Sequence, residues 1–205
     1  MIENENNRII QITWRDQSPA DALVQVGEWL ENQGDLAAAG HYYEAAVAVD
    51  STFAFAVWRL GQLALRQRKF ADAIAALTEA AALTPDHAPT LHLLSEAHFQ
   101  MGEVEKALQW SNAVLTLQNN HAGALLIKMR CLAQVRDWVA LGEAAEDAAL
   151  VLANAAERQL FAALSKANLG DWEAALAIVS RISAGSLRRH ADLERSVVDA
   201  VRLAR

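Results

Sequence analysis

Side chains that could act in catalysis or bind a metal are few in this sequence, and their spacing suits neither role. Among the six histidines, His92 and His98 are six positions apart, which places them on different faces of a helix. The sequence contains no His-Glu-x-x-His motif, no glycine-rich phosphate loop and no serine in a glycine-flanked elbow. Cys131, the single cysteine, lies in the apolar run 125–132, where a packed thiol is expected. We therefore predict a protein that is not an enzyme and that needs no metal or other cofactor.

The composition is typical of a helical protein with a folded core. Of the 205 residues, 53% are hydrophobic and 21% are charged, and proline occurs only three times in a chain rich in alanine. The formal net charge of −7 argues against a nucleic-acid partner, because phosphates are neutralised by clustered lysine and arginine. Residues 181–205 alone carry a charge of +3, which is typical of a solvated helix end or of a docking patch for an acidic partner.

The most regular feature is a turn element that recurs every 34 residues. It falls at Gly34, Arg68, Gly102, Arg136 and Gly170, each followed by a polar residue and then a bulky apolar one. Five positions after each turn the residue is alanine, as two closely crossing helices require, except for Leu141 in the fourth unit. A fixed period of this length predicts a helical repeat array that presents a long curved surface instead of a pocket. The bulk of Leu141 predicts a more open fourth hairpin.

The residues around this turn resemble the tetratricopeptide repeat, which carries Leu-Gly, alanine and a closing proline at fixed positions. The second unit matches most fully, through Val57, Leu60, Gly61, Ala73, Leu77, Ala80 and Pro85. The resemblance implies an all-α fold, a right-handed α-α superhelix in which antiparallel helix hairpins form a solenoid. The five implied repeats span about residues 20–53, 54–87, 88–121, 122–155 and 156–185. Their implied helices are 20–33 and 36–49, 54–67 and 70–83, 88–101 and 104–117, 122–135 and 138–151, and 156–169 and 172–184.

The N-terminal arm, residues 1–19, has a different pattern. Ile10, Ile12 and Trp14 alternate with polar residues, as they would in a strand. Three interpretations stay open: an arm packed on the first hairpin, a disordered tail, or a latch in the groove of its own or a neighbouring chain. The arm lacks the features of a secretory signal, and no apolar stretch approaches the roughly 20 residues that span a bilayer. We therefore expect a cytoplasmic protein without membrane insertion.

The C-terminal segment, residues 186–205, is expected to form one capping helix. A terminal repeat leaves one apolar face without a neighbour, so an additional helix is needed to cover it. Ser186 is the expected N-cap, and Leu193, Val197 and Val201 form the apolar stripe.

In the family that this sequence resembles, the first helix of each repeat lines a concave groove that holds the partner. Carried over by register, the groove positions combine aromatic, apolar and charged side chains. They are Val24, Glu28 and Glu31, then Phe55, Trp58, Leu65 and Arg66, then His92, Glu96 and Phe99, then Leu126 and Arg130, and finally Leu160 and Leu164. The nine residues from Phe55 to Arg130 in this series are the candidate partner-binding residues. Some members of the family clamp a peptide carboxylate with lysine and asparagine, but the matching positions here hold Val24 and Glu28.

The resemblance thus implies a non-catalytic scaffold or adaptor that captures a peptide segment or helix of another protein in its groove. Apolar anchors would give the affinity, while Arg66, Glu96 and Arg130 would set the register. Two alternatives stay open: a self-assembling module in which the arms of a homo-oligomer are exchanged between protomers, and a specialised secretion or assembly chaperone.

Overall fold

The computed structural model describes residues 18–152 and 155–204, and these residues form helices and turns without a strand. The predicted all-helical fold is confirmed. The helices are α1 (Pro19–Asn32), α2 (Leu36–Val49), α3 (Ala54–Arg66), α4 (Phe70–Leu83), α5 (Ala88–Gln100), α6 (Val104–Leu117), α7 (Ala122–Gln134), α8 (Trp138–Asp147), α9 (Ala156–Asn168), α10 (Trp172–Val179), α11 (Ala184–Arg189) and α12 (Ala191–Ala204). The three interpretations of the N-terminal arm concern residues 1–17, which lie outside the described part of the chain.

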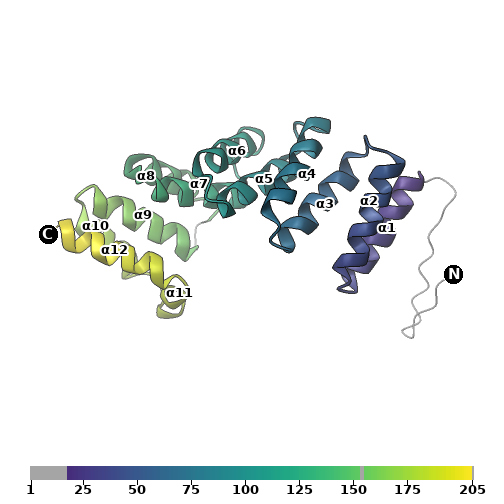
Figure 1. Ribbon diagram of the computed structural model, residues 1–205. Coiled ribbons are helices and arrows are strands. Elements are labelled where there is room, and N and C mark those ends of the chain that lie inside the picture. Colours follow the sequence, from purple (N-terminus) through teal and green to yellow (C-terminus); the bar gives the residue numbers. More distant parts are fainter. Residues whose placement is uncertain (1–17, 153–154, 205) are drawn as a thin grey trace. The chain divides into compact units, whose positions relative to one another are not determined.

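The chain divides into two compact units, with the boundary between Pro85 and Asp86. In the first unit, α1 pairs with α2 and α3 pairs with α4 as antiparallel hairpins (Figure 1). In the second unit, α5 pairs with α6, α7 with α8, and α9 with α10, and α12 covers the last hairpin. The start of α1 is fixed by Ser18, whose hydroxyl accepts a hydrogen bond from the Asp21 amide in a capping box.

The recurring turn residues have a conformational role. Gly34, Gly102 and Gly170 have φ values of +87°, +76° and +91°, and Arg68 and Arg136 both have a φ of 60°. They are the residues with positive φ in the described part of the chain. A residue in the left-handed conformation after a helix lets the next amide groups bond to the last helical carbonyl groups, and it reverses the chain direction. The 34-residue period therefore marks the C-terminal cap of the first helix in each hairpin.

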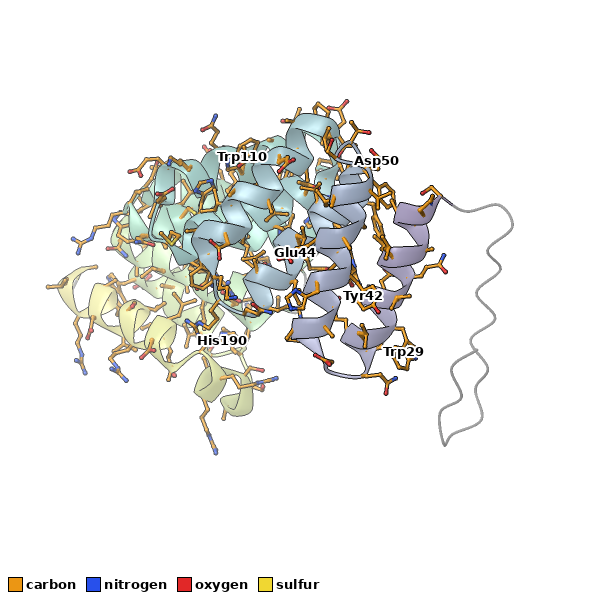
Figure 2. All side chains as sticks on the ribbon, turned by 45° about the vertical axis from the view of Figure 1, so that its right-hand side comes forward. Trp29, Tyr42, Glu44, Asp50, Trp110 and His190 are labelled. Carbon is orange, nitrogen blue, oxygen red and sulfur yellow. The ribbon has the colours of Figure 1, made fainter. Side chains whose placement is uncertain are left out.

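Small residues let the two helices of a hairpin approach closely. A Cβ atom on Gly61 of α3 would lie 2.5 Å from Cγ of Leu77 on α4, and one on Gly27 of α1 would lie 2.5 Å from Cε1 of Tyr43 on α2. The helical period along α2 separates core from surface: Ala39, Tyr43 and Ala46 are buried. Tyr42 and Glu44, which Figure 2 labels, are exposed. In each of these two hairpins, a glycine on the first helix leaves the space that Leu77 or Tyr43 of the second helix fills.

The fourth hairpin departs from the regular pattern. Helices α7 and α8 contact each other less extensively than the helices of the other hairpins, as the bulk of Leu141 predicts. In addition, α8 ends at Asp147, four residues earlier than expected. Arg158 of α9 meets this end of the helix: its Nη1 atom donates to the Ala145 carbonyl at 3.1 Å, and its Nε atom donates to the Leu152 carbonyl at 3.0 Å. The guanidinium thus satisfies the Ala145 carbonyl, which a longer α8 would have bonded within itself, and the Leu152 carbonyl beyond the helix.

The C-terminal segment contains two helices, where one capping helix was expected. Ser183 caps α11, and its hydroxyl accepts a hydrogen bond from the Ser186 amide, so Ser183 takes the role predicted for Ser186. The chain leaves helical geometry at His190 and resumes as α12. Val197 and Val201 of α12 are buried in one core cluster with residues of α9, which is the covering role expected of a cap.

Candidate functional site

The residues considered first for chemistry are engaged in packing or in pairs. Cys131 is buried in α7, and burial raises the pKa of its thiol to about 11, so the sulfur is a protonated packing group at neutral pH. His98 Nδ1 lies 2.7 Å from the Glu103 carboxylate. Within residues 18–152 and 155–204, no three His, Cys, Asp or Glu side chains lie close enough to hold a metal ion. Across the same ranges, no helix is both long and apolar enough to cross a bilayer.

Four of the predicted partner-binding residues lie on α3 in the first unit. Phe55 is 42% exposed, and its ring centroid lies 5.4 Å from that of Trp58 and 6.2 Å from that of Phe53. Trp58 and Leu65 are half-buried, and Arg66 is exposed. The aromatic rings thus form a cluster whose outer member, Phe55, offers apolar area to solvent.

An ionic network that sequence reasoning missed adjoins this cluster. Arg59 of α3 reaches α1, where its Nη2 atom lies 3.0 Å from Oε2 of Glu31 and 3.4 Å from Oε1 of Glu28. Arg66 also pairs with Glu31. Arg59 is not a groove position in the register of the repeat, because it directly follows the groove position Trp58, whereas its partners Glu28 and Glu31 are both groove positions. Much of the charge near Phe55 is therefore neutralised within the first unit.

Tyr43 connects the network to the core. Its hydroxyl donates to Oε2 of Glu31 at 2.8 Å and accepts from Nη2 of Arg59 at 2.9 Å. Burial, together with the hydrogen bond to Glu31, raises the pKa of this phenol well above its ordinary value of 10. Since Tyr43 comes from α2, one polar cluster fixes three helices of the first unit relative to one another.

The other five predicted residues come together in the second unit. A pocket of about 180 Å³ lies between α5 and α7, and its walls include His92, Glu96, Phe99, Leu126 and Arg130. Its lining is completed by Gln100, Gly123 and Ile127, which sequence reasoning did not select. Two neighbouring first helices, α5 and α7, line this hollow, whereas the sequence predicted a groove without a local pocket. This hollow forms where the side chains of α5 and α7 do not contact each other.

His92 forms one wall of this pocket through an aromatic contact. Its ring centroid lies 4.7 Å from that of His121, the N-cap residue of α7. Nδ1 of His121 accepts a hydrogen bond from the Ala124 amide at 3.1 Å. A Cβ atom on Gly123 would lie 2.5 Å from Cε1 of His92, so glycine is required for the ring to sit against α7. Burial and the neighbouring His121 lower the pKa of His92, which favours its neutral form.

The two charged residues of the pocket differ in their surroundings. Nε of Arg130 donates to Oε1 of Glu157 on α9 at 2.7 Å, so this guanidinium is compensated from inside the unit. Glu96 has no ion pair with any residue in the described part of the chain. The pocket therefore combines apolar lining residues with a carboxylate that has no ion-pair partner among residues 18–152 and 155–204.

Three of the positions carried over by register do not face a groove. Val24 is buried in the core cluster of the first unit, together with Ala56 and Leu63 of α3. Leu160 and Leu164 of α9 are also buried. They belong to the core that α12 completes, so the end cap covers the face that an internal repeat would leave open.

Comparisons with known proteins agree on one type of repeat. Two sequence models of the tetratricopeptide repeat match this chain, one over residues 27–88 and the other over residues 64–131. Among curated proteins, the chain is 23% identical over 130 residues to the Protein CTR9 homolog of Arabidopsis thaliana. This match covers 62% of the chain but only 12% of the length of that relative.

Solved structures with the same fold have low sequence identity to this chain. The MamA protein has a TM-score of 0.76 at 17% identity, with 84% of this chain and 94% of MamA covered. YrrB, described as a TPR protein with an unusual peptide-binding site, has a TM-score of 0.74 at 16% identity, with 89% and 92% covered. The first TPR of Spaghetti (RPAP3), bound to the HSP90 peptide SRMEEVD, has a TM-score of 0.56 at 21% identity, with 57% and 93% covered. At these identities the likeness concerns the fold alone.

Proposed function

Because this chain belongs to the tetratricopeptide repeat family, we propose that it is a non-catalytic scaffold that binds a peptide segment of a partner protein. The observation that carries the proposal is the pocket between α5 and α7, which five of the nine candidate residues line. Binding sites for peptide side chains are concave and combine apolar surface with placed polar groups. This pocket sets Phe99, Leu126 and Ile127 beside the polar side chains of His92, Glu96, Gln100 and Arg130.

The aromatic cluster at the start of α3, whose exposed member is Phe55, is a second contact surface in this proposal. Phe55 buries large area at low entropic cost when a partner covers it, which is why aromatic residues dominate recognition surfaces. Arg59 and Arg66 are already paired with Glu31, so they position the cluster and leave apolar contact as its main source of affinity.

Peptide binding is also the activity described for two of the similar structures, YrrB and the first TPR of Spaghetti. We propose that the present chain binds without a clamp for a peptide carboxylate. Val24, at one of the matching positions, is buried, and Glu28, at the other, carries a negative charge that is shared with Arg59. Neither position supplies a cation or amide to hold a carboxylate.

The proposal can be tested by affinity capture from a lysate of the source cells, in which the unchanged protein is compared with a variant whose pocket is blocked. The variant Gln100→Trp adds bulk at the lining of the pocket without removing a buried side chain, and Gln109→Trp makes the same change on the exposed side of α6. We expect a partner that the unchanged protein and Gln109→Trp retain and that Gln100→Trp loses. Equal capture by all three proteins would place recognition outside the pocket.

Once a partner is identified, alanine variants of the aromatic anchors measure how much each side chain contributes to the binding free energy. Trp58→Ala and Phe99→Ala should each weaken binding by about 2 kcal/mol, as expected for buried aromatic anchors. Calorimetry measures this loss, and circular dichroism checks that each variant is folded. Normal binding by both variants would contradict the assignment of these residues.

The alternative functions make different predictions. Exchange of the arm between protomers requires a homo-oligomer that depends on concentration and disappears when residues 1–18 are deleted, and mass measurement in solution tests this directly. A secretion or assembly chaperone would instead retain a single client protein in the affinity capture. Cytoplasmic localisation stays a prediction of the sequence alone.

A further inference from the structure

We propose that the pocket between α5 and α7 selects a peptide segment in which one bulky apolar residue is flanked by lysine or arginine, and that it discriminates against acidic segments. The inference rests on the proposed peptide-binding function and adds the chemistry of the segment that is bound. It follows from the size of the pocket, from its apolar floor and from the unequal compensation of Glu96 and Arg130.

The size and lining of the pocket suit one apolar side chain. A cavity of about 150 Å³ lined by aliphatic and aromatic groups holds a benzene ring, and the pocket here has a volume of about 180 Å³. Phe99 and Leu126 are half-buried in its walls, and Ile127 is buried beneath it. A phenylalanine, leucine or methionine side chain would cover these apolar groups, whereas a small residue would leave them wet.

The charges around the pocket are not balanced. Nε of Arg130 pairs with Glu157, whose side chain is 17% exposed, so an acidic peptide would share this guanidinium, which is itself 40% exposed, with a carboxylate already in place. Glu96 offers its carboxylate without such a competitor among the described residues. His92 adds no positive charge at neutral pH, because burial and His121 favour its neutral form. Counted together, Glu96, Arg130 and the Glu157 that pairs with it carry one net negative charge at this site.

The charge of the whole chain acts in the same direction. A formal net charge of −7 attracts cationic segments and repels acidic ones during diffusional encounter. Since this long-range term is screened by salt while apolar contact is not, the preference for basic segments should weaken at high ionic strength. For a partly exposed charge such as Glu96, replacing lysine by glutamate in the segment should weaken binding by roughly five- to tenfold.

Selection from a random twelve-residue peptide library displayed on phage tests the inference before any natural partner is identified. The baits are the full-length unchanged protein, Glu96→Arg, and the matched charge variant Glu143→Arg on the exposed side of α8. We expect the unchanged protein and Glu143→Arg to enrich peptides with a bulky apolar residue next to lysine or arginine. Glu96→Arg should enrich aspartate or glutamate next to the same apolar residue.

Fluorescence anisotropy with one enriched peptide then measures the preference. Its Lys→Glu form should bind the unchanged protein about five- to tenfold more weakly, and Glu96→Gln should reduce this difference to less than about twofold. Gln100→Trp should lose both forms, which assigns the signal to the pocket.

The outcomes separate this inference from the proposed function. If peptides are enriched and depend on the pocket but show no basic preference, or an acidic one, the inference is wrong and peptide binding stands. If no bait enriches any peptide, both are overturned. A basic preference that survives in Glu96→Arg also overturns the inference, because the selecting charge would then lie elsewhere.

Discussion

Arg59 and Glu31 join two neighbouring first helices through an ion pair with 3.0 Å between Nη2 and Oε2. Their side chains are 15% and 10% exposed. The pair sits beside the exposed aromatic cluster of α3, and the Tyr43 hydroxyl binds both partners. A surface proposed for recognition is therefore anchored by polar contacts that face inward.

Removal of Arg59 should destabilise the first unit. Arg59→Met leaves Glu31 poorly exposed and short of one cation, and should lower the free energy of unfolding by about 2 kcal/mol. Arg66→Met removes another cation from the same carboxylate, but the Arg66 side chain is 49% exposed, so its loss should matter by less than about 1 kcal/mol. Urea unfolding of the two variants measures the difference, and equal effects would contradict a special role for Arg59.

Tyr43 should make the protein sensitive to alkali. Its phenol has a raised pKa in the folded state, so above the ordinary value of 10 the unfolded chain releases a proton that the folded chain keeps. The free energy of unfolding should therefore fall as pH rises above 10, and Tyr43→Phe should remove this part of the dependence. In Tyr42→Phe, Tyr43 is the only tyrosine left, and tyrosinate absorbance should appear only as the helical signal is lost. Ionisation of Tyr43 in the folded protein near pH 10 would refute the prediction.

Arg136 should be replaceable by glycine with a gain in stability. It holds a φ of 60°, a conformation that is strained by about 1 kcal/mol for a residue with a Cβ atom. Arg136→Gly should therefore raise Tm by about 2–4 °C for a chain of this size, whereas Arg136→Ala should not. Arg68→Gly should give a smaller gain, because the Arg68 guanidinium lies 5.8 Å from the ring centroid of Phe70 and this contact would be lost. A gain of equal size in Arg136→Ala would show that backbone strain is not the cause.

His92 should make the protein sensitive to acid. Its pKa is lowered in the folded state, so below the ordinary value of 6.5 the unfolded chain takes up a proton that the folded chain resists. The free energy of unfolding should fall as pH drops from about 7 to about 5, and part of this fall should be absent from His92→Phe. The charged or titratable groups near this ring are Glu96 and Arg130 of the pocket lining and His121 at the start of α7. His41→Phe on the exposed side of α2 is the control, and identical thermal melting profiles for both variants between these pH values would argue against the prediction.

The candidate site shows how far register alone could identify residues. His92, Glu96, Phe99, Leu126 and Arg130 were selected by their positions on first helices, and all five line one pocket. Val24, Leu160 and Leu164 were selected in the same way and are buried. The difference is due to neighbours: α3 buries Val24 and α12 helps to bury the face of α9, whereas the described residues leave the pocket between α5 and α7 open.

The sequence by itself determined the helices, the period and the turns. These features are local: a residue with positive φ every 34 positions, an alanine five positions later and an apolar stripe are enough to specify a hairpin. Most helix bounds could therefore be predicted within two residues, and the exceptions are the ends of α8 and α10 and the division of the cap.

The tertiary structure alone decided which carboxylate each arginine reaches, where the surface is hollow and which repeat face the cap covers. Arg59 finds Glu31 across 28 positions, and Arg130 finds Glu157 across 27, by contacts between helices of different hairpins. Such ion pairs depend on the angle at which helices cross and on side-chain length, and the 34-residue period does not specify either. The sequence of one repeat specifies its own hairpin. The neighbouring repeats that stack against it determine which of its charged side chains are paired and which of its residues are exposed.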